Sequence, residues 1–253
     1  MRGQDSGFRI QNGREPKPES RIPNPSPNFD DRDKTVPPQY IVLHYTGMKT
    51  GTEALARLCD PAAKVSAHYV VEEDGRVFQL VDEGKRAWHA GKSMWRGIAD
   101  MNSASVGIEL VNPGHRYGYR PFPAAQIAAL KELIRDIVQR HGINPKTCLL
   151  AHADIAPGRK EDPGELFPWQ DLAKDGLGLW PAPQKDDYGH AEDDEVQNLL
   201  RTIGYDCPDT GAYDRATRAA LLAFQRHYQP DNLTGTPERE TIARLRAMAR
   251  TIK

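Results

Sequence analysis

The sequence predicts an α/β fold in which a mixed central sheet is flanked by helices, followed by a small C-terminal domain of three helices. Between residues 35 and 180, short apolar runs alternate with helical patterns, as expected where strands and helices interleave in one domain. Beyond residue 191, three amphipathic stretches are short enough to form one small bundle. A chain of 253 residues has the length of one large domain and one small one.

Residues 1–34 precede the first predicted element and carry five prolines but few large apolar side chains. Such a segment buries too little apolar surface to form a packed element. We therefore expect an extended N-terminal arm, within which residues 20–29 could lie across the domain surface.

The first half of the large domain contains signals for strands and one short helix. Residues 40–44 are an apolar run that predicts a buried strand, and Gly51-Thr52 could cap a helix through Leu58. Asp74-Gly75 separates two strand-like segments, 67–71 and 76–81, and predicts a hairpin. Residues 105–111 predict a further strand.

The second half begins with the clearest helical pattern of the chain. Pro123 opens it and Gly142 is its natural end. Its apolar positions recur at three-to-four spacing: Ile127, Leu130, Ile134 and Ile137. A short strand at 148–151 and a short helix at 169–175 complete the predicted large domain, residues 35–180.

Residues 181–191 are rich in proline and polar side chains and predict a linker to the C-terminal domain, residues 192–253. Three helical stretches are expected there, and their apolar positions are Val196, Leu199, Leu200 and Ile203, then Ala216, Ala220, Leu221 and Phe224, then Ile242, Leu245, Met248 and Ile252.

Composition excludes several classes of protein. The chain has 34 basic and 35 acidic side chains, and this balance argues against a nucleic-acid partner. No apolar run approaches the ~20 residues that a membrane span needs, and no signal peptide is visible at the start. Three distant cysteines make a disulfide framework unexpected.

Two histidines and one aspartate are the candidate metal ligands. His44 and His152 each end a short apolar strand, and Asp162 follows ten residues after His152. Strand ends meet open clefts, and two imidazoles with one carboxylate suit Zn²⁺ while leaving a fourth position for water. Spacing alone leaves the alternative open, because a histidine after a strand is more often packed or solvated than a ligand.

Several motifs in unbroken order resemble the zinc-dependent N-acetylmuramoyl-L-alanine amidases of the type 2 amidase family. They span residues 38–180, in the bacterial branch related to recycling and outer-membrane amidases. The motifs are LHYT at 43–46, SAHYV at 66–70, DGRV at 74–77, WHAG at 88–91, SVGIEL at 105–110, HADIAPGRK at 152–160 and DPG at 162–164.

The resemblance implies a role for each matching residue. His44, His152 and Asp162 match the zinc ligands, Glu109 the catalytic glutamate and Lys160 the catalytic lysine. A carboxylate beside the attacking water can move its proton to the leaving amine, and an ammonium can stabilise the oxyanion.

Three further side chains, His89, Tyr45 and Trp95, are weaker candidates for contact with substrate. For Tyr45 and Trp95, packing in an aromatic core is the equal alternative. His68 lies in the middle of a strand, and we interpret it as a core residue or a support for the ligands.

The C-terminal residues resemble a peptidoglycan-binding domain of the three-helix type over positions 192–250. One departure is that residues 226–233 replace a shorter, glycine-rich connection. The motifs are EVQNLL at 195–200, IGY at 203–205, YDRATRAA at 213–220, LAFQ at 222–225 and GTP at 235–237.

The resemblance predicts hydrolysis of the amide between N-acetylmuramic acid, including 1,6-anhydro forms, and L-alanine. Peptidoglycan or a muropeptide is the expected partner, and Zn²⁺ the expected cofactor. A wall-binding domain favours the periplasm or cell envelope, with the cytoplasm as the alternative because no leader is visible.

Three other functions remain as alternatives. They are a recognition protein without catalysis, a metal hydrolase for another amide, and a cysteine hydrolase using Cys148. A recognition protein has no need of the full set of five site residues, and Cys148 lies in an apolar strand where an inert thiol is expected.

Overall fold

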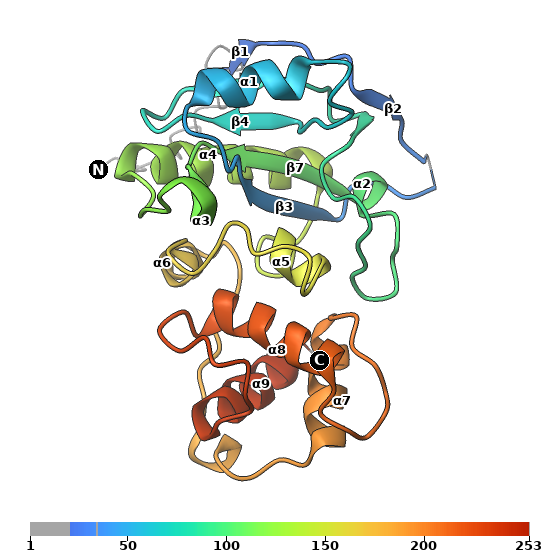
Figure 1. The fold of residues 1–253 in the computed structure, drawn as a ribbon, viewed down its shortest axis with the longest axis vertical. Helices are drawn as coiled ribbons and strands as arrows, with labels where there is room; N and C mark the ends of the chain where they lie inside the picture. The colour runs from blue at the N-terminus through green and yellow to red at the C-terminus, as the bar shows by residue number, and fades with distance from the viewer. Residues whose placement is uncertain (1–20, 34, 253) are drawn as a thin grey trace, which may run out of the picture.

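The protein, described here by a computed structural model covering residues 21–33 and 35–252, is built on a six-stranded sheet with a helical domain beneath it (Figure 1). The strand order is β1-β5-β4-β7-β3-β8. β4 and β5 pair antiparallel, and the other neighbours in this sheet pair parallel. The strands are β1 (Arg21–Pro23), β3 (Tyr40–Tyr45), β4 (Tyr69–Val71), β5 (Val77–Gln79), β7 (Ser105–Leu110) and β8 (Leu149–Ala151).

Helices cover both faces of this sheet. Adjacent residues of a strand point to opposite faces. Val70 of β4 packs in one cluster with Leu58 of α1 (Gly51–Cys59), whereas Val71 packs in the other with Ile127 of α4 (Ala124–His141). The sheet is therefore buried between α1 and α4, which explains why its strands are continuous apolar runs.

The expected helix ends are confirmed with one small shift. Pro123 precedes α4, and Gly142 ends it in the left-handed conformation, with φ of 62°. The cap of α1 is Thr50 rather than the expected Gly51-Thr52, because the Thr50 side chain accepts a hydrogen bond from the Glu53 N–H. Short helices between the main elements are α2 (Met101–Ala104), α3 (Gly114–Tyr117), α5 (His152–Ile155) and α6 (Trp169–Lys174).

The prediction of an unpacked arm is wrong for residues 21–33, while residues 1–20 and 34 lie outside the described part. β1 pairs with β5, and β2 (Phe29–Asp31) pairs antiparallel with β6 (Lys85–Ala87). Arg32 is buried and donates hydrogen bonds to the carbonyls of Glu83, Lys85 and Ser105. Strands of three residues interrupted by prolines carry no readable periodicity, so composition misled the prediction.

The C-terminal part consists of α7 (Asp193–Ile203), α8 (Arg215–Tyr228) and α9 (Arg239–Thr251), as the periodicity predicts. Helix α8 lies beside α5 and α6 (Figure 1). One continuous apolar core joins the two parts of the chain. The predicted linker contains a 3-10 turn, Lys185–Asp187, whose buried Asp187 accepts a hydrogen bond from Arg250 of α9 at 2.9 Å.

Candidate active site

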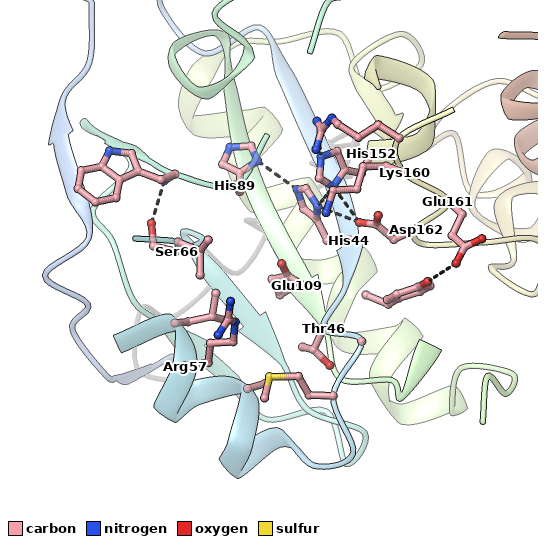
Figure 2. A pocket seen from close by; sticks show the side chains of 18 of the residues that line it. His44, Thr46, Arg57, Ser66, His89, Glu109, His152, Lys160, Glu161 and Asp162 are labelled. Atoms are coloured by element: carbon pink, nitrogen blue, oxygen red, sulfur yellow. Dashed lines mark hydrogen bonds and ion pairs between the residues drawn. The ribbon is translucent and has the colours of Figure 1, made fainter. Parts of the chain in front are cut away.

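The register of two strands brings two of the candidate metal ligands together, and a loop brings the third. β3 and β8 are parallel neighbours with Leu43 opposite Ala151. The next residues along the chain, His44 and His152, therefore emerge at the same edge of the sheet. Asp162 reaches them from the loop after α5, and all three side chains are buried (Figure 2).

The ligand atoms converge on one point. His44 Nδ1 lies 2.8 Å from His152 Nδ1, and Asp162 Oδ2 lies 3.1 Å and 3.0 Å from these two nitrogens. Tetrahedral zinc with bonds of about 2.0 Å separates its ligand atoms by roughly 3.3 Å. Two nitrogens and one carboxylate oxygen in this arrangement fit Zn²⁺.

The contacts behind the ligands favour the same interpretation. His152 Nε2 donates to the carbonyl of Ala90 at 3.0 Å, which leaves the Nδ1 lone pair directed at the cluster. His44 Nε2 lies 3.1 Å from His89 Nδ1. His89 fits against β7 because residue 107 is glycine, whose absent Cβ would otherwise lie 2.4 Å from the His89 ring.

Electrostatics favours the metal-binding protonation states of His44 and Asp162. Burial, followed by the neighbouring His152, lowers the pKa of His44 to about 4. Burial opposes ionisation of Asp162, but His152 and His44 hold the pKa of its carboxyl well below its usual range. Neutral imidazoles and an ionised carboxylate are the forms that bind zinc.

Glu109 and Lys160 both line the cleft that opens beside the trio. Glu109 lies on β7 directly opposite His44, and its buried Oε2 has no hydrogen-bond partner among residues 21–33 and 35–252. Burial, followed by repulsion from Asp162, raises the pKa of Glu109 well above its usual range. A carboxyl group whose pKa is raised in this way is suited to take up a proton and release it again during a reaction. Lys160 is exposed, and its positive charge acts on both His44 and Glu109.

Of the three weaker substrate candidates, two line the cleft and one does not. Tyr45 lines the cleft, and its hydroxyl lies 3.0 Å from His115 Nδ1. His89 also lines the cleft, but its ring contacts His44. The expected groove position of Trp95 is wrong, because Trp95 is buried against Tyr205 of the C-terminal domain, with ring centroids 5.0 Å apart.

The cleft has a volume of about 690 Å³ and includes residues that the sequence analysis missed. Arg57 enters from α1, and Leu222 and Arg226 enter from α8. Leu222 begins the LAFQ motif of the C-terminal domain, but no motif indicates that these three residues line the cleft, since they reach it only through tertiary packing. The buried Cys148 does not line the cleft, and burial raises the pKa of its thiol to about 12, so it is not a nucleophile.

Comparison with known proteins places this geometry in a family. Residues 34–165 match the family model described as N-acetylmuramoyl-L-alanine amidase. The chain belongs to this amidase family. Residues 190–245 match a second model, described as a putative peptidoglycan binding domain.

Relatives of the amidase family cover most of the chain. The N-acetylmuramoyl-L-alanine amidase AmiD of Escherichia coli is 42% identical over 224 residues, which are 80% of this chain and 79% of AmiD. A structure of AmiD from E. coli, in complex with the substrate anhydro-N-acetylmuramic acid-L-Ala-D-gamma-Glu-L-Lys, is 36% identical with a TM-score of 0.73. It covers 88% of this chain and 98% of that one. A structure of AmpDH3 from Pseudomonas aeruginosa, in complex with anhydromuramic pentapeptide, is 30% identical with a TM-score of 0.78. It covers 98% of this chain and 99% of that one. The mixed α/β fold is thus the fold of these amidases.

Proposed function

We propose that the protein is a zinc-dependent hydrolase of the amide bond between N-acetylmuramic acid, including its 1,6-anhydro form, and L-alanine. The convergence of His44, His152 and Asp162 beside Glu109 is the observation that carries the proposal. The substrates named for the two structural relatives, both anhydromuramic peptides, supply the substrate class.

The ligand trio would hold the ion, which supplies Lewis-acid polarisation of the scissile carbonyl when bound. Glu109 takes a proton from the attacking water as its oxygen bonds to the carbonyl carbon. As the carbon–nitrogen bond breaks, Glu109 returns that proton to the departing amine of L-alanine. Lys160 faces the same cleft, where its ammonium stabilises the negative charge on the carbonyl oxygen.

The decisive experiment is a digest of an anhydromuramoyl peptide with the purified full chain. Release of the L-alanine-led peptide is followed by mass spectrometry, with and without a chelator, and zinc is then added back. We expect release that stops with the chelator and returns with zinc. No release from protein with zinc demonstrably bound would overturn the proposal in favour of a recognition protein without catalysis. Equal cleavage of a peptide that lacks the sugar would instead favour a hydrolase of other amides.

We also propose that the substrate is encountered in the cell envelope. The match of residues 190–245 to a putative peptidoglycan binding domain favours a polymeric or wall-derived substrate, and peptidoglycan lies outside the cytoplasm. In the described residues, no helix has the length and apolarity needed to cross a membrane. Fractionation of cells expressing the native gene, probed with an antibody, tests the location.

A further inference from the structure

Helix α8 of the C-terminal domain forms one side of the catalytic cleft. Leu222 and Arg226, one turn apart on α8, line the cleft together with Glu109. The loop between the two ligands His152 and Asp162 runs along the same helix. At Gly158 in this loop, a Cβ would lie only 3.2 Å from Ala219 Cβ of α8.

A buried polar contact fixes α8 relative to the ligands. Asp154, two residues after His152, accepts hydrogen bonds from Tyr205 and from His227 Nδ1 of α8, each at 2.7 Å. The His227 ring stacks on Trp169, with centroids 3.7 Å apart. Since all of these groups are buried, Arg226, next to His227, is held in a fixed place beside the cleft.

The guanidinium of Arg226 has no close acceptor among the described residues. Its side chain is 21% exposed, and its buried Nε makes no hydrogen bond. The nearest carboxylate oxygens are Glu161 Oε2, 3.8 Å from Nη2, and Glu165 Oε2, 4.0 Å from Nε. Both distances exceed a hydrogen bond. These carboxylates are already engaged elsewhere, because His115 lies 3.1 Å from Glu165 and 3.4 Å from Glu161.

We propose that Arg226 binds a free carboxylate of the stem peptide, so that the C-terminal domain contributes directly to substrate specificity. This inference rests on the proposed amidase function. In a peptide joined through D-gamma-Glu, as in the ligand of the E. coli relative, the α-carboxylate of that residue is free, as is the carboxylate at the peptide's end. Arginine is suited to this partner because its planar fork donates two parallel hydrogen bonds to a carboxylate.

Steady-state kinetics on three substrates tests the inference. They are anhydro-N-acetylmuramic acid-L-Ala-D-gamma-Glu-L-Lys, the same compound with the glutamate α-carboxylate amidated, and the same compound with the terminal carboxylate amidated. For Arg226→Gln, KM on the parent substrate should rise roughly tenfold or more, as expected for the loss of a charge-assisted hydrogen bond, with kcat little changed. On one of the amides, wild type and variant should have the same KM, because the partner of Arg226 is already absent. On the parent substrate, the KM of Arg226→Lys, which keeps the charge but not the planar fork, should lie between the KM values of wild type and Arg226→Gln.

Arg215→Gln is the matched control, since Arg215 is an exposed arginine of α8 outside the cleft, and its KM should equal that of wild type. Zinc content and thermal midpoint are measured for every variant. A KM increase by the same factor on all three substrates, or no increase on the parent, would overturn the inference. Should Arg226→Gln fail to fold, wild type alone decides, because equal kcat/KM on the parent and both amides excludes any carboxylate subsite. Failure of wild type to cleave the parent would instead reject the amidase function itself.

Discussion

His44 and Glu109 lie side by side because β3 and β7 are parallel neighbours that pair these two residues in register. Paired residues of adjacent strands project from the same face, about 4.8 Å apart. The backbone hydrogen bonds of the sheet therefore fix the separation between a candidate metal ligand and the proposed proton carrier. A shift of one residue in either strand would turn one of the two side chains to the opposite face.

Replacing Glu109 by Gln should abolish turnover and leave zinc binding intact. The amide keeps the size of the side chain but accepts no proton from water, and losses of about 10²–10⁴-fold are typical for a general base. Glu109 is outside the ligand cluster, so zinc per chain, measured by atomic absorption, should stay at the wild-type value. Glu53→Gln, an exposed glutamate of α1, is the control and should cleave the muropeptide at the wild-type rate. Full activity of Glu109→Gln would remove Glu109 from the mechanism.

Replacing Asp162 by Ala should weaken zinc binding. The substitution removes one of three converging ligand atoms and the negative charge that balances the ion. After dialysis against a mild chelator, the variant should lose its zinc under conditions in which wild type and Asp171→Asn retain theirs. Asp171 is a suitable control because it forms a surface ion pair with Lys131. Unchanged zinc content in Asp162→Ala would contradict the assignment.

The sequence predicted the positions of the candidate ligands better than the tertiary contacts around them, for a physical reason. The apolar runs predict that His44 and His152 each lie at the end of a buried strand, and the parallel pairing of β3 with β8 brings those two ends to one edge of the sheet. The roles of Glu109 and Lys160 needed the family motifs, since an isolated strand glutamate or surface lysine carries no signal.

Other features depend on contacts between segments far apart in the chain. Arg32 is buried only because carbonyls from two distant segments surround it, those of Glu83 and Lys85 and that of Ser105. Trp95 is aromatic and lies near the motifs, yet it packs against Tyr205 of the C-terminal domain. Periodicity within a single segment does not indicate which distant segments pack against it. For the same reason the sequence analysis did not identify Arg226 as a cleft residue.

Breaking the contact between Asp154 and the C-terminal domain should destabilise the whole fold. Tyr205→Phe leaves one buried oxygen of Asp154 without its donor, which costs about 1–3 kcal/mol in the free energy of unfolding. His227→Asn should cost a similar amount, and the double variant should be non-additive because both donors share Asp154. Urea unfolding measures each value. Tyr188→Phe, which removes an exposed hydroxyl bonded to Glu240, should change stability by less than about 0.5 kcal/mol. A strictly additive pair would mean that the two contacts are independent.

The buried ring of His68 should make the protein less stable as the pH falls. His68 Nδ1 accepts from the Gly107 N–H at 2.9 Å, so the proton lies on Nε2, which faces the Lys85 carbonyl. Burial, followed by the charge of Arg32, lowers the pKa of His68 to about 4, although Glu83 and Asp82 oppose the shift. In the unfolded chain His68 takes up a proton near pH 6.5, whereas in the folded chain its ring becomes protonated only near pH 4.

Between these two pH values, His68 should therefore remove about 1.4 kcal/mol of stability for each unit that the pH falls. In His68→Asn the amide oxygen can still accept from Gly107, but the side chain no longer titrates. For His68→Asn with zinc bound, we expect a smaller slope of unfolding free energy against pH in this window. The decrease should reach at most the value for one proton, about 1.4 kcal/mol per pH unit. His190→Asn is the control, because the His190 side chain is 80% exposed and lies at the surface. If His68→Asn retained the wild-type slope, the acid sensitivity would have to arise from other buried groups, of which His89, 5.7 Å from the His68 ring, is the nearest titratable ring.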